Sequence, residues 1–229
     1  MSDNRNLETN IDISNYNSLV AAINYEYCKK HNYDFLYYRP YLDDNTITNL
    51  YNCIDPNTKL VRHSAWSKLL STSKALKLQY DYVVYIDSDC IFKDLQKSLE
   101  VFIEPYTEKD IIFLNNKPWG NDKPCSGFFI CKICPRIIQF VDDWYNFNFN
   151  GKKNPCRWEQ GALWLMFKEH NIEIVDSWMF REEKGQYLRH VGSNENKIRI
   201  PYFTRFIKEN DINYTQNICE IKVVEFNTK

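Results

Sequence analysis

Residues Tyr82 to Ile86 form an unbroken run of β-forming residues, Tyr-Val-Val-Tyr-Ile, which constrains the fold more than any other stretch of the chain. A strand without alternating polar positions is covered on both faces, as in the mostly parallel sheets of α/β proteins. The run ends in Asp87-Ser88-Asp89. Because open α/β sheets bind ligands just outside the carboxyl ends of their strands, the sequence predicts an α/β fold with a ligand site near these acids.

Helical and extended patterns alternate along the rest of the chain. Leu19, Ile23 and Tyr27 recur at helical spacing, and the pattern ends at His31-Asn32. Further helices are expected to begin at Ser64, Pro135 and Gln160, further strands at residues 33–38, 111–114, 127–133, 172–175 and 218–226, and a loop over residues 43–59. This order predicts one α/β domain over residues 1–229, in which residues 1–13 are disordered or form a degenerate first strand.

The composition excludes several classes of protein. With 44% hydrophobic and 26% charged residues, the chain is not a disordered one. Lys plus Arg number 29 against 30 Asp plus Glu, so no excess of positive charge favours nucleic acid. No apolar run reaches the length of about 18 residues that a membrane span needs. We expect no nucleic acid partner, no membrane span and a cytoplasmic location.

The eight cysteines are expected to be reduced thiols. A chain of this size builds a large core without disulfides, and nothing in the sequence suggests export. Cys131 and Cys134 have the spacing of a redox or zinc pair, but Pro135 follows them and no second pair completes a tetrahedral site. We therefore interpret them as structural.

The spacing of Asp87 and Asp89 suits a metal ion. Side chains two residues apart in an extended chain point to the same side, so both carboxylates can face one cation. Oxygen ligands favour Mg²⁺ or Mn²⁺, which commonly share a few carboxylates with substrate phosphates. The expected partner is therefore a phosphorylated ligand. The alternative is a solvated turn whose acids cap the next helix.

Five segments resemble glycosyltransferases of the GT-A fold, in that family's order. They are residues 24–35, Ala65-Trp66-Ser67-Lys68, Tyr82 to Asp89, Ser126-Gly127-Phe128-Phe129 and Glu159-Gln160-Gly161-Ala162-Leu163. The pattern is similar to that of the fungal α-galactosyltransferases and α-mannosyltransferases and the plant xyloglucan xylosyltransferases, and spans residues 17–192. It implies a GT-A-like α/β/α sandwich with a mostly parallel mixed central sheet.

The resemblance also implies an activity: metal-dependent transfer of a sugar from a nucleotide diphosphate donor, a UDP- or GDP-sugar, to a hydroxyl of a glycan or glycoprotein, usually with retention. Asp87 and Asp89 would hold Mn²⁺ or Mg²⁺. His190, in His190-Val191-Gly192-Ser193, resembles the family's third ligand, although the motif is one residue short. Lys197 or Arg199 is a candidate for the diphosphate. The alternatives are a surface histidine and a solvated basic loop.

The same resemblance assigns roles around the donor sugar. Glu159 and Gln160 match an acidic-Gln pair at the reaction centre, and Trp158 is a candidate floor for the acceptor. Candidates for contact with the nucleotide-sugar are Lys68, Arg62, Ser88, Asn115, Ser126, Gly127, Gly192 and Lys197. The alternatives are a surface role for the two cations and a helix-dipole role for Glu159.

The chain departs from the family in two ways. Residues 1–13 are polar where a first strand normally begins the nucleotide pocket. Family members often carry a Golgi membrane anchor, and because this chain shows none we expect a fragment or a cytosolic enzyme, in the host cytoplasm if viral. Two other functions stay open: a phosphatase of the haloacid dehalogenase type, with Asp87 as nucleophile, and a non-catalytic carbohydrate-binding domain.

Overall fold

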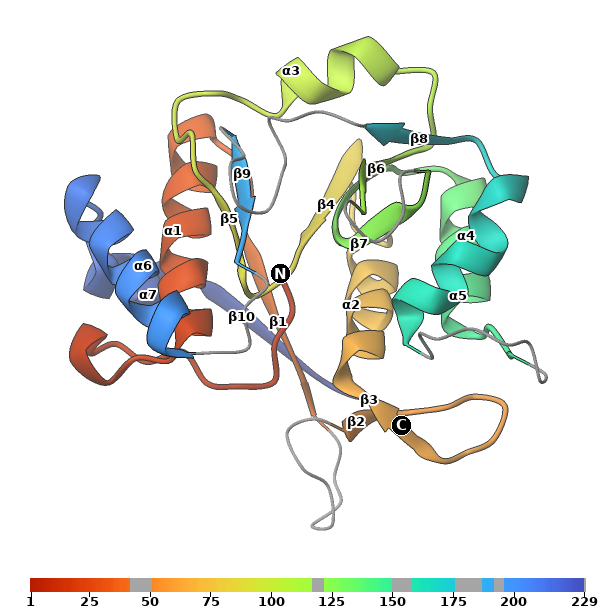
Figure 1. Cartoon of the computed structure of the whole chain (residues 1–229), viewed down its shortest axis with the longest axis horizontal. Coiled ribbons are helices and arrows are strands. Elements are labelled where there is room, and N and C mark those ends of the chain that lie inside the picture. The colour runs from red at the N-terminus through yellow and green to blue at the C-terminus, as the bar shows by residue number, and fades with distance from the viewer. Residues whose placement is uncertain (42–50, 117–121, 150–157, 176–186, 192–195, 229) are drawn as a thin grey trace. The chain divides into compact units, whose positions relative to one another are not determined.

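The computed structural model describes residues 1–41, 51–116, 122–149, 158–175, 187–191 and 196–228. These residues form two compact units (Figure 1). The first unit comprises Met1–Arg39, Ile86–Val101 and Ser177–Glu225, and the second comprises Pro40–Tyr85, Phe102–Asp176 and Phe226–Lys229. Each unit is therefore assembled from segments that are far apart in the sequence.

Helix α1 (Tyr16–His31) is the core of the first unit. It packs against α6 (Asn196–Glu209), α7 (Tyr214–Glu220) and β5 (Cys90–Phe92), and its apolar residues Leu19 and Ile23 are fully buried. The last turn carries Lys29, Lys30 and His31, which complement the helix dipole, and Asn32 ends the helix in a left-handed conformation with a φ of 58°. The predicted helix is confirmed.

Two small sheets complete the first unit. β5 pairs antiparallel with β9 (Leu188–His190), with Cys90 opposite His190. β1 (Leu36–Tyr41) pairs with β10 (Lys222–Asn227). On the N-terminal side, Ser2 forms a parallel bridge with Tyr38, and the Tyr38 N–H donates to the Met1 carbonyl at 2.9 Å. The polar first residues thus lie alongside β1.

The second unit contains a four-stranded mixed sheet in the order β4-β7-β6-β8. Its strands are β4 (Tyr82–Ile86), β7 (Pro124–Lys132), β6 (Ile111–Asn115) and β8 (Ile172–Val175). β6 runs antiparallel to β7 and parallel to β8. Every residue from Ile111 to Leu114 is buried, as expected of a strand covered on both faces.

Helices α2 (Ser67–Ala75), α4 (Pro135–Tyr145) and α5 (Glu159–Met166) accompany this sheet, and α5 packs on β7 (Figure 1). Trp144 of α4 is fully buried and contacts Phe113 and Phe129 of the sheet, with ring centroids 6.1 and 5.8 Å away. The remaining elements are β2 (Tyr51–Ile54), β3 (Val61–His63), α3 (Glu100–Ile103) and the short 3₁₀ turns Ile11–Ile13, Ser64–Trp66, Glu104–Tyr106 and Phe167–Glu169.

Two expectations about elements were wrong, at least in part, and one helix was missed. β2 lies inside the expected loop of residues 43–59, where it pairs with β3. α7 occupies the first residues of the expected strand 218–226, and β10 confirms the later part of that strand. α6, which contains Pro201, was not predicted, because residues 176–229 show only weak periodicity.

The expected α/β fold class, with a mixed central sheet, is confirmed. The cysteines that the structure describes, all but Cys156, form no disulfide. Among the described residues, none of the helices combines the length and the apolar character that crossing a bilayer requires.

Candidate functional site

The acidic turn Asp87-Ser88-Asp89 connects β4 to β5. The Cys90 N–H donates to the Asp87 carbonyl at 3.1 Å and closes the turn. All three residues of the turn are half-buried. Because this hydrogen bond closes the turn and the fully buried strand β5 follows it, the two carboxylates are held at a defined place in the first unit.

The pairing of β5 with β9 brings His190 to this turn. Cys90 lies opposite His190, and the Val191 N–H donates to the Asp89 carbonyl at 2.9 Å. His190 Nε2 lies 3.0 Å from Asp89 Oδ1. One ligand atom from each of Asp87, Asp89 and His190 falls within 4.8 Å of the others, so a metal ion could contact all three.

Asn24 of α1 fixes the strand that follows the turn. Its side chain is fully buried, with Nδ2 donating to the Cys90 carbonyl at 2.9 Å and Oδ1 accepting from the Phe92 N–H at 3.1 Å. These two backbone groups point away from β9. The Asn24 carboxamide therefore makes the hydrogen bonds that a neighbouring strand would make on that side of β5. The signal in the sequence is an Asn among the apolar residues of a predicted helix, but only the fold shows its partner.

Arg199 of α6 holds the same acid from another side. Its Nη2 donates to Asp89 Oδ2 at 2.5 Å, and its Nε donates to the Val191 carbonyl at 2.8 Å. Arg199 is 6% exposed, and its guanidinium lies 4.6 Å from the centroid of the Tyr16 ring. From the sequence, Arg199 was predicted only as a candidate for contact with a diphosphate, because no local pattern indicates that α6 returns to the acidic turn.

The chemistry of these groups fits a small divalent cation. Two carboxylates and an imidazole are ligands that Mn²⁺ accepts, and Mg²⁺ takes the carboxylates. Three protein ligands leave positions of an octahedral ion for water or for phosphate oxygens. Asp87, Asp89 and His190 are therefore called the cation centre below.

A second polar cluster lies in the second unit, and Lys68, Ser126 and Glu159 form it. The Lys68 Nζ is 3.0 Å from Glu159 Oε1, and the Ser126 hydroxyl donates to that oxygen at 2.9 Å. Lys68 also donates to the Ser126 carbonyl at 3.2 Å. Each residue is at most 4% exposed. The three residues are called the buried ion network.

Glu159 is charged despite its burial. Burial raises the pKa of the carboxyl, but the charge of Lys68 and the hydrogen bonds from Lys68 and Ser126 outweigh it and hold the pKa below its ordinary value. The other oxygen, Oε2, is buried and has no hydrogen-bond partner among the residues that the structure describes. An unpaired buried carboxylate oxygen costs free energy, which a hydrogen bond from a donor at Oε2 would recover.

Gln160 lies next to the network with both ends of its amide engaged. Its Oε1 accepts from the Ser126 N–H at 2.8 Å, and its Nε2 donates to the Pro124 carbonyl at 2.6 Å. Asn115 lies opposite Pro124 in the register of β6 and β7, and Gly127 follows Ser126 on β7. The structure thus gathers these predicted residues at the beginning of β7.

Arg62, another candidate for contact with the nucleotide-sugar, makes its contacts outside the buried ion network. It is 9% exposed and lies between the rings of Trp66 and Tyr145, 3.9 and 4.2 Å from their centroids. Its Nη2 donates to the Tyr145 carbonyl at 2.8 Å, and its Nη1 is 3.9 Å from Asp55 Oδ2. These contacts tie β3 to α4.

Trp158, just before α5, is supported on one face. Its ring is stacked on His63 at a centroid distance of 4.6 Å and an interplanar angle of 12°, and the residue is still 53% exposed. His63 Nδ1 accepts from the Ala65 N–H. Burial lowers the pKa of His63, Glu159 opposes this shift and Lys68 adds to it, so the imidazole is neutral at pH 7.

Two predicted residues remain. Lys197 is an exposed residue of α6, two positions before Arg199, and Gly192 lies outside the described residues.

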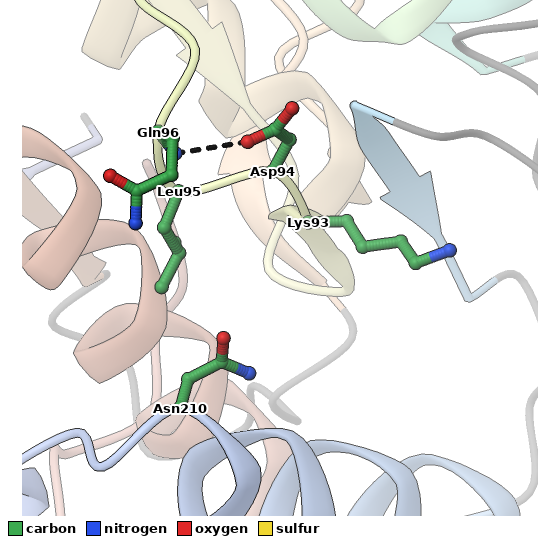
Figure 2. Close-up of a pocket in the computed structure, with 5 residues that line it drawn as sticks. All are labelled: Lys93, Asp94, Leu95, Gln96 and Asn210. Atoms are coloured by element: carbon green, nitrogen blue, oxygen red, sulfur yellow. Dashed lines mark hydrogen bonds between the residues drawn. The ribbon is translucent and has the colours of Figure 1, made fainter.

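The first unit also has a surface pocket of about 420 Å³ lined by Lys93, Asp94, Leu95, Gln96 and Asn210 (Figure 2). The Asp94 carboxylate there accepts from the Gln96 N–H at 3.0 Å, and the Lys93 side chain extends away from Asn210. None of these five residues was predicted to belong to the site.

Comparisons with known proteins bear on the fold. No protein-family model matches the sequence, and no curated protein matches it. A solved glycosyltransferase involved in the glycosylation of the major capsid of PBCV-1 is similar in structure, with a TM-score of 0.62 and 14% identity, over 82% of this chain and 92% of that one. HddC from Yersinia pseudotuberculosis covers 81% of this chain and 84% of its own at 11% identity, with a TM-score of only 0.40. The chain therefore has an α/β fold like that of a solved glycosyltransferase, in agreement with the expected GT-A-like class.

Proposed function

We propose that the protein is a metal-dependent glycosyltransferase that moves a sugar from a nucleotide diphosphate donor to a hydroxyl of a glycan or glycoprotein. The observation that carries the proposal is the cation centre, where Asp87, Asp89 and His190 converge directly after β4. The similarity in fold to a glycosyltransferase of the PBCV-1 capsid supports it. A donor diphosphate would complete the coordination of Mn²⁺ or Mg²⁺, with Lys197 and Ser88 as further contacts.

The transfer needs a stabilised leaving group. The bond between the anomeric carbon and the diphosphate oxygen breaks, and its electron pair leaves with the nucleoside diphosphate. The acceptor oxygen bonds to the anomeric carbon, and its proton passes to the departing phosphate or to water. A bound cation would stabilise the charge on the departing diphosphate. Asp87, Asp89 and His190 would hold that cation, and Arg199 would orient Asp89.

We propose that the buried ion network binds the donor sugar. Glu159 is anionic at neutral pH, and its Oε2 lacks a donor that a sugar hydroxyl can supply. Lys68 and Ser126 hold the other oxygen, so the carboxylate is oriented beforehand. Gln160 keeps a second lone pair on Oε1 beside the Ser126 N–H. On the basis of the resemblance, we propose that Gln160 lies near the anomeric carbon and that the transfer retains the configuration of that carbon. Asn115 and Gly127 are proposed as neighbouring contacts.

Trp158 is proposed as the floor for an acceptor sugar. A ring that is supported by His63 on one face and 53% exposed offers its other face to the C–H groups of a sugar. We expect Trp158→Ala to weaken binding of an acceptor glycan about tenfold in a fluorescence titration, a loss typical of a few favourable ring contacts. Tyr80→Ala, at an exposed aromatic residue of the same unit, is the control. Equal affinity in Trp158→Ala would exclude the stacking role.

The test of the main proposal is calorimetry of UDP and GDP with and without Mn²⁺. Wild-type protein should bind one of the two only with the cation, and Asp89→Ala should abolish binding while Asp94→Ala, at a carboxylate away from the centre, should not. A screen of nucleotide-sugars for slow hydrolysis then identifies the donor. Release of inorganic phosphate from monoesters would instead support a phosphatase, and glycan binding without any metal requirement would support a non-catalytic domain. Nucleotide binding that ignores both Mn²⁺ and Asp89→Ala refutes the proposal.

A further inference from the structure

The two oxygens of Asp89 have different partners. Oδ1 lies 3.0 Å from His190 Nε2, on the side of the cation centre. Oδ2 accepts from Arg199 Nη2 at 2.5 Å. A hydrogen bond between a guanidinium and a carboxylate is charge-assisted and among the stronger ones in proteins. Oδ2 of Asp89 is therefore bound to Arg199, whereas Oδ1 faces Nε2 of His190.

Arg199 cannot easily release that oxygen. It is 6% exposed, so moving away would leave a buried charge without its partner. Its Nε is bound to the Val191 carbonyl at 2.8 Å, and its guanidinium lies over the Tyr16 ring. Arg199 thus joins Asp89 to the strand that carries His190.

We propose that Arg199 is a specificity-determining residue, which keeps Asp89 monodentate and thereby makes the cation centre prefer Mn²⁺ and Mg²⁺ over Ca²⁺. Ca²⁺ takes six to eight oxygens at about 2.3–2.6 Å and often binds a carboxylate through both oxygens, whereas Mg²⁺ takes six at about 2.0–2.1 Å. Withholding Oδ2 removes a ligand that Ca²⁺ uses and the smaller ions do not need. This inference rests on the cation centre of the proposed function.

The experiment compares the ratio of Mn²⁺ to Ca²⁺ affinity in the full chain after removal of bound metal. Mn²⁺ binding is followed by electron paramagnetic resonance, and Ca²⁺ is added as a competitor. In Arg199→Gln, Asp89 can offer both oxygens, so we expect the ratio to fall about tenfold, the scale of effects from groups that orient metal ligands. Arg205→Gln removes a charge from the exposed side of the same helix, and we expect the wild-type ratio there.

The ratio of Mn²⁺ to Ca²⁺ affinity distinguishes a change in ion specificity from a change in the charge near the site. Loss of a nearby positive charge strengthens the binding of both ions and leaves the ratio of their affinities unchanged. A wild-type ratio in folded Arg199→Gln, or the same fall in Arg205→Gln, overturns the inference. If Arg199→Gln does not fold, Arg199→Lys takes its place: it keeps the charge without the planar fork, and we expect a smaller fall, whereas an unchanged ratio overturns the inference. Wild-type protein that binds neither Mn²⁺ nor Mg²⁺ would instead refute the cation centre itself.

Discussion

At the scale of single residues, the chain places several charges in its interior and pairs each with specific partners. Lys68 and Glu159 are both almost fully buried, and the Lys68 Nζ lies 3.0 Å from Glu159 Oε1. The carboxylate of Asp89 is bound by Arg199. Removing one member of a buried pair is costly because the other is left charged and desolvated. Such pairs therefore fix positions in the fold that apolar residues of similar size would leave less specific.

The Lys68–Glu159 pair leads to a prediction about stability. Lys68→Met should lower the free energy of unfolding by about 3–5 kcal/mol, because Glu159 stays buried without its counter-charge. Glu159→Gln in the same chain should recover part of this loss. Lys74→Met, at an exposed lysine of the same helix, should change stability by less than about 1 kcal/mol. Urea unfolding is measured for wild-type protein, Lys68→Met, Glu159→Gln, the double variant and Lys74→Met, and losses that simply add in the double variant would mean that the two residues do not interact.

The pH dependence of stability follows from the lowered pKa of Glu159. The ordinary pKa of the carboxyl is 4.5, and in the fold it is lower. The contribution of the carboxylate is therefore present above pH 4.5 and is lost as the pH falls through the lower value. The stability difference between wild-type protein and Glu159→Gln should accordingly shrink on acidification. Urea unfolding at pH 7 and below pH 4.5 checks this, and a difference that grows toward acid would mean the opposite shift.

At the scale of elements, the strand β5 has a partner on each side. β9 pairs with one edge, and the carboxamide of Asn24 binds the Cys90 and Phe92 backbone on the other. The short strand thus has the hydrogen bonds of a central strand, although the sheet itself contains only β5 and β9. A rigid β5 keeps Asp89 and His190 in register.

Asn24→Ala tests this role of the carboxamide. The variant removes both hydrogen bonds that the buried carboxamide makes to the β5 backbone, which should cost about 1–3 kcal/mol of stability. Mn²⁺ binding should weaken about tenfold, because β5 orients a ligand of the cation centre. Asn15→Ala is the control, since the Asn15 side chain makes no capping hydrogen bond to the same helix. Unchanged Mn²⁺ affinity in a folded Asn24→Ala protein would show that β9 alone fixes β5.

Local patterns allow most elements to be predicted, but not their partners. The apolar run at β4 and the helical spacing of α1 are encoded within a few residues, so both were predicted. β2 depends on pairing with β3, and α6 is stabilised by packing on α1 in spite of Pro201, so both were missed. Asp87, Asp89 and His190 could be suggested by motif and resemblance. The contacts of Asn24 and Arg199 could not be predicted, because each joins two residues that are far apart in the sequence, by 66 and by 110 positions respectively.

At the scale of the whole molecule, the described cysteines differ sharply in environment. Cys28, Cys53, Cys90 and Cys131 are buried, whereas Cys219 is exposed. Burial raises the pKa of Cys28 and of Cys53 to about 12, and it also raises that of Cys131. Since the thiolate is the reactive form, these three thiols are inert in the folded protein.

Thiol labelling of the native protein checks this environment. Cys219 should react rapidly with a disulfide reagent, and Cys219→Ser should remove one fast-reacting thiol. Cys28→Ser and Cys53→Ser should leave the number of fast-reacting thiols unchanged, because these groups react only on unfolding. A reducing agent should not alter the urea midpoint. Rapid labelling of Cys28 or Cys53 would indicate that their surroundings open easily.

The pairing of β5 with β9 has a consequence for biosynthesis. The carboxylates of Asp87 and Asp89 are translated about a hundred residues before His190 and Arg199, as the sequence shows. A nascent chain that has not yet reached β9 carries both acids without the imidazole or the guanidinium. Because domains form as their segments leave the ribosome, a cation centre of the proposed kind would be completed only at the last stage of maturation. A metal ion supplied during early translation would then find two of its three ligands and would not guide the folding of the earlier segments.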